Sequence, residues 1–363
     1  MPRIHEDRRR RLQAVLTARD LDAALVTELH NVRYLTGFSG SNGAVLVPAD
    51  GPPIFATDGR YIEQGQVETN LDPRLVKGAL VPKLPPIVVE AGHRRIAVET
   101  HHLTVDQYDA LRSADGADSL RLDSLERAVE ELRTVKDAEE VAALREACDI
   151  STQALERLVA GPVVGRTELE LTRELDNLML DLGAEAVGFD TIMASGPNSS
   201  IPHHQPTDRT VERGDLLKID FGARVRGYHA DCTRTFAVGA EPADWQRDVY
   251  SAVHEAQAVG LDRARPDADT RVVFDAVLAS LEPTGHADKF VHGLGHGVGL
   301  QIHEEPFMGQ TTTGRLPDRT AITIEPGVYL PGLGGVRIED TLVVHADAPE
   351  ILTTASKDLR VVG

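Results

Sequence analysis

Short hydrophobic runs alternate with amphipathic stretches over the first third of the chain. Runs rich in Val, Ile and Ala predict strands, and apolar residues spaced three or four apart predict helices. The strands are expected at 22–27, 43–48, 53–57 and 95–99, and the helices at 8–20 and 104–114. Strands that alternate with helices are typical of an α/β domain.

A charged stretch from Ser124 to Ala160 follows this region. Its helical spacing predicts two helices, and Asp137, followed closely by two glutamates, is suited to cap the second. We place the domain boundary inside the first part of this stretch. The expected domains are therefore residues 1–127 and residues 128–363.

The second domain continues with a predicted helix at 167–183 and then turns to strands, hairpins and glycine-rich loops. Helices followed by a strand-rich half favour an α+β architecture with a curved antiparallel sheet. The expected fold class is therefore α/β for the first domain and α+β for the second.

Composition narrows the classes of function. The chain has 363 residues, which suits two domains, and its net charge of −19 argues against a nucleic-acid partner. It contains no apolar run near the roughly eighteen residues of a membrane span, so no membrane partner is expected. The basic N-terminal residues have no apolar segment behind them, so we expect no secretory signal. Two cysteines, Cys148 and Cys232, are typical of a reducing compartment, and a cytoplasmic location is expected.

Four glycines at alternate positions mark the segment from Phe290 to Pro306, FVHGLGHGVGLQIHEEP. His292 and His296 have the i, i+4 spacing of a helical zinc site. However, each interior glycine costs a helix about 1 kcal/mol relative to alanine. The period of two instead predicts extended backbone with one bare face that another segment approaches closely. His292, His296 and His303 therefore need another explanation.

An acidic pair is predicted on a hairpin spanning 214–238. A two-residue turn at 226–227 would place Gly222 opposite Asp231, with Asp220 on the same face as Gly222. The two aspartates would then be diagonal neighbours, roughly 7–8 Å apart or less. Two carboxylates that close are costly unless a cation lies between them.

A second hairpin is predicted over 320–344, with Glu325 and Glu339 at equivalent heights if its loop is odd or bulged. Any one of these acids alone is more often a solvated surface residue. As a set they lie among the apolar neighbours of interior strands, where carboxylates are rare unless they are paired or bind a metal. Four carboxylates and the neutral imidazole of His296 fit two divalent cations, with four negative charges against four positive ones, and a water between the metals could lose its proton near neutral pH.

The order of these segments resembles metallopeptidase family M24, the group of aminopeptidase P and prolidase. The resemblance is carried by ASGPNSSIPHHQPTDR, KIDFGARV, YHADCTRTF, HGLGHGVGLQIHEEP, TIEPGVYL and VRIEDT, and it covers nearly the whole chain. It implies a creatinase-like N-terminal domain, a pita-bread catalytic domain and a dinuclear metal site. Mn²⁺ is the expected metal, with Co²⁺ or Zn²⁺ as alternatives.

The resemblance implies a role for each candidate metal ligand. Asp220 would bind one metal, and Asp231 and Glu339 would bridge both. His296 and Glu325 would complete the site of the other metal. Glu325 is also a candidate proton shuttle.

The resemblance further implies three catalytic histidines and one substrate-binding arginine. His203 is similar to the family histidine that contacts the substrate near the leaving group, and His292 flanks the same cleft and binds substrate with it. His303 is the candidate for stabilising the oxyanion. His204 stands where the family carries another residue, so either ring could face the substrate, and we favour His203. Arg337 would hold a bridging carboxylate or a substrate carboxylate.

The implied reaction is hydrolysis of the bond before a proline at the second position of a peptide. The segments NVRYLTGFSGSNG and ATDGRYIEQ resemble aminopeptidases P more than prolidases, so we expect an Xaa-Pro aminopeptidase. The alternative is an Xaa-Pro dipeptidase (prolidase), restricted to dipeptides. A non-catalytic binding module or a creatinase would not keep all five ligands, and a methionine aminopeptidase generally lacks this N-terminal domain. The family also implies a homodimer.

Overall fold

The computed structural model describes residues 2–363, and the chain divides into two compact units, Met1–Arg133 and Thr134–Gly363. The first is an α/β unit and the second an α+β unit, which confirms the predicted fold class. The boundary expected after residue 127 lies just before α6 (Ala128–Thr134). The exact point of separation between folding domains stays a prediction.

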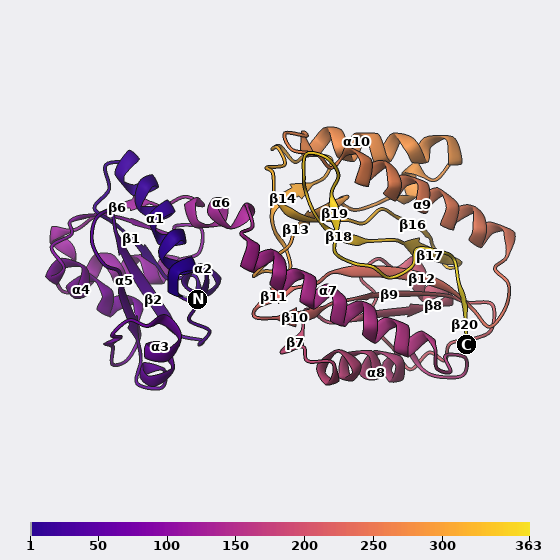
Figure 1. The fold of residues 1–363 in the computed structure, drawn as a ribbon, viewed down its shortest axis with the longest axis horizontal. Helices are drawn as coiled ribbons and strands as arrows, with labels where there is room; N and C mark the ends of the chain where they lie inside the picture. The colour runs from indigo at the N-terminus through magenta and orange to yellow at the C-terminus, as the bar shows by residue number, and fades with distance from the viewer. Residues whose placement is uncertain (1) are drawn as a thin grey trace. The chain divides into compact units, whose positions relative to one another are not determined.

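The first unit is built on a six-stranded mixed sheet with helices packed around it (Figure 1). The strand order is β4-β3-β2-β1-β5-β6, with β1 antiparallel to β2 and parallel to β5. Its hydrophobic core includes Leu25, Leu46 and Ile96. Besides α6, the helices and strands are α1 (Pro2–Ala18), β1 (Ala23–Val26), α2 (Leu29–Thr36), β2 (Gly43–Pro48), β3 (Ile54–Thr57), α3 (Ile62–Thr69), β4 (Arg74–Leu75), α4 (Leu84–Glu90), β5 (Arg95–Val98), α5 (Val105–Ser113) and β6 (Arg121–Ser124).

Four of these strands and two of these helices were predicted from the sequence, namely β1, β2, β3, β5, α1 and α5. The helix α2 was not predicted, because it is only eight residues long and is capped by an unusual residue. The side chain of Glu28 accepts a hydrogen bond from the Asn31 amide, whereas the preferred cap residues are Ser, Thr, Asp and Asn. The edge strands β4 and β6 carry too few apolar residues to show in the pattern.

The second unit contains two larger, mainly antiparallel sheets and two small ones. One has the order β20-β12-β9-β8, with β20 parallel to β12, and the other has the order β14-β13-β15-β18-β19. Its helices and strands are α7 (Ala138–Val159), α8 (Glu168–Asp181), β7 (Ala186–Val187), β8 (Ile192–Ser195), β9 (Leu216–Phe221), β10 (Ala223–Val225), β11 (Tyr228–His229), β12 (Cys232–Val238), α9 (Asp244–Arg263), α10 (Thr270–Leu281), β13 (Gly295–Gly297), β14 (Glu304–Met308), β15 (Ala321–Ile324), β16 (Gly327–Leu330), β17 (Gly334–Arg337), β18 (Asp340–Val343), β19 (Glu350–Ile351) and β20 (Val361–Val362).

Helices cover the strands of the second unit on both sides. Figure 1 shows α7 and α8 on one side of the strands and α9 and α10 on the other. The core under α9 and α10 joins Val253 and Val277 to Ile324 of β15 and Val336 of β17. The strands that carry the candidate ligands are therefore held between helical layers.

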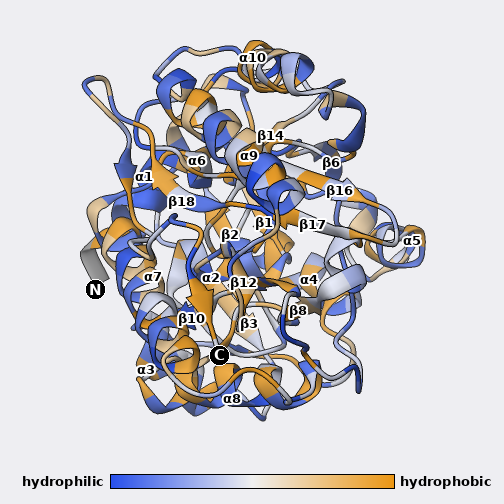
Figure 2. Ribbon diagram, turned by 90° about the vertical axis from the view of Figure 1, so that its right-hand side faces the viewer, coloured by the Kyte–Doolittle hydropathy of each residue, from blue (hydrophilic) through white to orange (hydrophobic). Residues whose placement is uncertain are grey.

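Helix caps in this unit follow the sequence pattern. Asp137 caps α7 in a capping box with Glu140, as predicted, and Thr167 caps α8 in a second capping box. Hydrophobic and hydrophilic residues alternate along α8 (Figure 2), which buries Leu171 and Leu175 on its inner face. Over residues 2–363, no helix combines the length and the apolar character that crossing a membrane requires.

Candidate metal centre and active site

The first hairpin of the second unit places Asp220 and Asp231 diagonally across from each other. Val225 pairs with Tyr228 around the two-residue turn at 226–227, and the same register continues to Asp220, which pairs with Thr233. Asp231 lies two residues before Thr233, so their side chains lie on the same face of the hairpin. Because Thr233 pairs with Asp220, Asp231 and Asp220 are diagonal neighbours on that face. The predicted register is confirmed.

The second hairpin places Glu325 opposite Glu339. One register joins Ile324 to Asp340 in β15 and β18, and it continues through the pair of Gly327 and Arg337 in β16 and β17. The two glutamates lie between these ladders, at matching positions. The innermost pair, Leu330 with Gly334, leaves a three-residue loop, so the loop is odd, as face-to-face placement requires.

The glycine-rich segment is extended, as its period of two predicts. Its central strand β13 is paired on one side with β14 and on the other with β15. A Cβ at position 295 would overlap the carbonyl oxygen of Thr323, and one at 297 would overlap that of Glu305. These glycines are needed because neighbouring backbone approaches closely, and His296 is presented between them.

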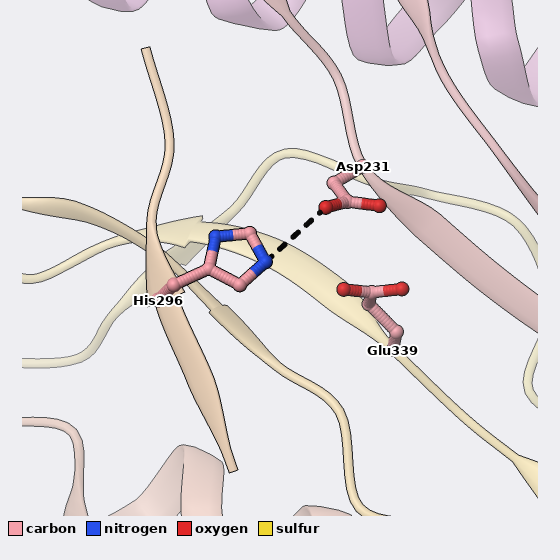
Figure 3. A group of neighbouring side chains, drawn as sticks. All are labelled: Asp231, His296 and Glu339. Atoms are coloured by element: carbon pink, nitrogen blue, oxygen red, sulfur yellow. Dashed lines mark ion pairs between the residues drawn. The ribbon is translucent and has the colours of Figure 1, made fainter. Parts of the chain in front are cut away.

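The structure brings the five candidate ligands together around one cavity of about 450 Å³. Figure 3 shows Asp231, His296 and Glu339 with their polar ends turned toward one another, and one ligand atom of each lies within 4.8 Å of the others. His296 Nε2 lies 3.5 Å from a carboxylate oxygen of Asp231 and 3.4 Å from one of Glu325. Asp220 lines the same cavity.

The tautomer of His296 suits a metal ligand. Its Nδ1 lies 3.0 Å from the carbonyl oxygen of Gly297, which can only accept, so the proton is on Nδ1. The lone pair of Nε2 then faces two carboxylates. Burial lowers the pKa of His296 to about 4, so the ring stays neutral. A lone pair and carboxylates that converge on one point fit a cation.

Positively charged groups of the protein do not by themselves neutralise the four carboxylates. Burial raises the pKa of Glu325 to about 8, with Asp220 adding to the effect and Arg337 opposing it. Burial, followed by the neighbouring carboxylates, raises the pKa values of Asp231 and Glu339 well above their ordinary range. One oxygen of Asp220, Oδ1, is buried without a hydrogen bond to any of the described residues. Two divalent cations would supply the missing positive charge.

Arg337 is buried behind the cavity, where it holds Asp220. Its guanidinium donates to Asp220, to the Tyr329 hydroxyl at 2.8 Å and to the Pro202 carbonyl at 3.1 Å. Arg337 thus holds Asp220, the carboxylate expected on one metal, and its expected hold on a bridging carboxylate stays a prediction. Contact of Arg337 with a substrate carboxylate stays a prediction.

The three candidate histidines line the cavity. His292 is neutral, because burial and the nearby Arg337 charge lower its pKa to about 3. The ring donates its Nδ1 proton to the Gly293 carbonyl at 2.7 Å, so its Nε2 accepts the hydrogen bond of the Tyr329 hydroxyl at 2.8 Å, and that hydroxyl in turn accepts from Arg337. The ring of His303 stands edge-on to that of His296, with centroids 4.4 Å apart, and burial lowers its pKa.

The structure separates His203 from its neighbour. His203 is exposed to the cavity, whereas His204 is buried and its Nε2 lies 2.8 Å from Glu168. His203 is therefore the ring of the pair that faces the cavity.

Four residues that support the site were not singled out in the sequence. Tyr329 lies four positions after Glu325, on the same strand face, so its period-two spacing could have identified it. Thr233 donates a hydrogen bond to Glu339 at 2.7 Å. Lys218 opens the segment KIDFGARV, two residues before Asp220, whereas Glu168 lies outside the motifs that surround the ligands. No sequence pattern connects either residue to His203.

Two family matches cover most of the chain. Residues 142–346 match metallopeptidase family M24, and residues 8–135 match the creatinase/prolidase N-terminal domain. The Xaa-Pro dipeptidase of Pyrococcus furiosus is 31% identical over 355 residues, which cover 98% of this chain and 99% of that protein.

Solved structures agree with these matches. The Xaa-Pro dipeptidase from Bacillus anthracis superposes with a TM-score of 0.92 at 33% identity, over 99% of this chain and 100% of that one. The X-Pro aminopeptidase from Thermotoga maritima superposes with a TM-score of 0.88 at 34% identity, over 94% and 98%.

The chain belongs to metallopeptidase family M24. Within it, the chain is an enzyme of the prolidase and aminopeptidase P group, with a creatinase-type first domain and a pita-bread catalytic domain.

Proposed function

We propose that the protein hydrolyses the peptide bond between an N-terminal residue and a proline at the second position. The observation that carries this proposal is the convergence of four carboxylates, three of them buried, and His296 on one cavity lined by three further histidines. Relatives named as Xaa-Pro dipeptidases and as an X-Pro aminopeptidase support the choice of substrate.

The five ligands Asp220, Asp231, His296, Glu325 and Glu339 would hold two divalent cations, with Mn²⁺ as the first choice. Oxygen donors with a single imidazole suit Mn²⁺, Co²⁺ and Zn²⁺. When bound, such cations activate water and polarise the scissile carbonyl.

The surrounding residues orient the substrate and handle its charge. His303 lines the cavity beside His296, where its ring can donate to the oxygen of the tetrahedral intermediate. His203, exposed to the cavity, would contact the peptide near the leaving nitrogen. His292 is locked by Tyr329 and by the Gly293 carbonyl, so it forms a fixed wall against which the proline ring can pack.

The preferred substrate is a peptide that continues beyond the proline, which makes the enzyme an Xaa-Pro aminopeptidase. The second candidate, hydrolysis of Xaa-Pro dipeptides, is favoured by the names of several relatives. A homodimer and a cytoplasmic location belong to the same proposal. Both described cysteines are unpaired and buried, which suits a reducing compartment.

The test compares one X-Pro-Y tripeptide, the matching X-Pro dipeptide and the X-Ala-Y tripeptide with the Mn²⁺-loaded protein. We expect the X-Pro-Y peptide to be cleaved at least about tenfold faster than X-Ala-Y, because a pocket shaped for the extra ring carbons discriminates by that order. The dipeptide should be slower than X-Pro-Y, and chelation should remove all three activities. Equal kcat/KM for proline and alanine would contradict the substrate, and a faster dipeptide would support the second candidate.

A further inference from the structure

The turn that carries His203 is held between two buried charged side chains, Lys218 and Glu168. Neither side chain lines the cavity. The inference drawn from them rests on the proposed function, in which His203 contacts the substrate.

Lys218 holds one side of the turn. It lies on β9, two residues before Asp220, and is completely buried. Its ammonium donates to the carbonyl oxygens of Ile201 at 2.7 Å and Pro202 at 3.2 Å, the two residues that precede His203. The same group lies 4.9 Å from the centre of the Tyr329 ring, on its face.

The hydrogen-bond partners of Lys218 indicate that this residue does not serve mainly to stabilise the fold. Lysine is almost never fully buried unless it is paired, because removing an ammonium from water is costly. Neutral carbonyl oxygens compensate less than a carboxylate would. An apolar side chain of similar volume in such a position is often neutral or stabilising. The hydrogen bonds of Lys218 therefore act to fix the turn that carries His203.

Glu168 holds the other side of the turn. One oxygen accepts hydrogen bonds from the amide and hydroxyl of Ser195, at 2.8 and 2.7 Å, and from Asn198 at 3.0 Å. The other accepts from the amide and hydroxyl of Thr207, at 3.0 and 2.8 Å, and from His204 at 2.8 Å. A single carboxylate thus ties both ends of residues 195–207 and turns His204 inward.

We propose that Lys218 and Glu168 are positioning residues that fix the placement of His203 against the substrate. Lys218 fixes the backbone just before His203, and Glu168 fixes the residue just after it. The ring between them is left to face the cavity.

The test is a double-mutant cycle on the full-length, Mn²⁺-loaded protein with an X-Pro-Y tripeptide. Lys218→Met replaces the ammonium by an apolar group of similar length. We expect it to lower kcat roughly ten- to a hundredfold, as displacement of a catalytic contact by about 1 Å does. In the His203→Ala background the same change should cost less than twofold, because the residue through which Lys218 acts is gone.

Hydrogen exchange of the peptide covering residues 196–207 gives a readout that does not depend on activity. Exchange should accelerate in Lys218→Met at unchanged metal content and unfolding temperature. The matched control is Lys289→Met, which removes a lysine paired with its neighbour Asp288 at 2.8 Å. The control should change neither exchange nor kcat. If Lys218→Met does not fold, Glu168→Gln probes the turn from the other side with the same two measurements.

The outcomes separate the two proposals. Unchanged exchange in Lys218→Met, or a loss of kcat that multiplies with that of His203→Ala, would overturn the positioning role. Absence of X-Pro cleavage by the wild-type protein would overturn the proposed function, while the exchange measurement would still decide whether Lys218 orders the turn.

Discussion

The four carboxylates of the cavity need a group outside the protein, a bound cation, to offset the cost of their charge. Thr233 and Arg337 supply two of the hydrogen bonds that these carboxylates accept, and Asp220 Oδ1 is buried without one from the described residues. Burial raises the pKa values of Asp231, Glu325 and Glu339 and so favours their protonated forms. Bound cations would reverse that preference and keep these three carboxylates charged.

Two histidines of the cavity are predicted to have different roles: His296 binds metal, and His303 stabilises the oxyanion. His303→Ala should keep both metals and lower kcat by roughly 10²–10³, the effect of losing one oxyanion donor. His296→Ala should instead lose metal, because its Nε2 lies nearly equidistant from Asp231 and Glu325. Metal analysis after dialysis, together with kcat, checks both variants. Loss of metal from His303→Ala would make that residue a ligand.

At the scale of elements, close backbone contacts hold the ligand strands together. Gly222 separates β9 from β10, and a Cβ there would overlap the carbonyl oxygen of Ala230, one residue before Asp231. The amide of Ala230 in turn donates to the Ala223 carbonyl at 2.9 Å. The glycine therefore sets how closely the segment that carries Asp231 approaches the strand that carries Asp220.

Gly222→Ala is expected to destabilise the second unit. Overpacking of this kind costs about 1–3 kcal/mol, which corresponds to a fall in Tm on the order of 2–10 °C for a domain of this size. Thermal unfolding measures the change. Gly161→Ala is the control, because a Cβ there meets nothing closer than 3.4 Å. Equal effects of the two substitutions would show that the contact with Ala230 is not limiting.

At the scale of the whole molecule, each unit has its own hydrophobic core. One core gathers around the six-stranded sheet and the other around α9, α10 and the strands β15 to β18. All five candidate ligands belong to the second unit. The chain has a single tryptophan, Trp245, on α9 of that unit. Its fluorescence therefore reports on the catalytic unit alone.

Removal of metal should lower the stability of the second unit selectively. A ligand present at a hundred times its Kd stabilises a fold by about 2.7 kcal/mol. Chelation should accordingly shift the transition followed by Trp245 fluorescence downward by roughly 5–10 °C. Calorimetry should show the transition of the first unit unchanged. Equal shifts of both transitions would contradict a metal centre confined to the second unit.

The sequence alone determined the local geometry of the site. The two-residue turn at 226–227 sets the offset between Asp220 and Asp231, and the odd loop after Leu330 sets Glu325 opposite Glu339. Alternate glycines predict the extended segment around His296. These features depend on neighbours within one hairpin or one strand, where chain connectivity and side-chain alternation leave few choices.

Only the tertiary structure decided how these local pieces meet. The hairpin that carries Asp220 and Asp231 belongs to one sheet, whereas β13 pairs with β15 of the second acidic hairpin in another sheet. The three segments come from different stretches of chain, and their convergence depends on packing between helical layers. The choice between His203 and His204 was likewise open in the sequence. It was decided by Glu168, 36 residues before His204, whose buried carboxylate needs donors and binds the second histidine. Contacts between distant segments leave no periodic signal along a chain, because burial and hydrogen bonding select the partner only after folding.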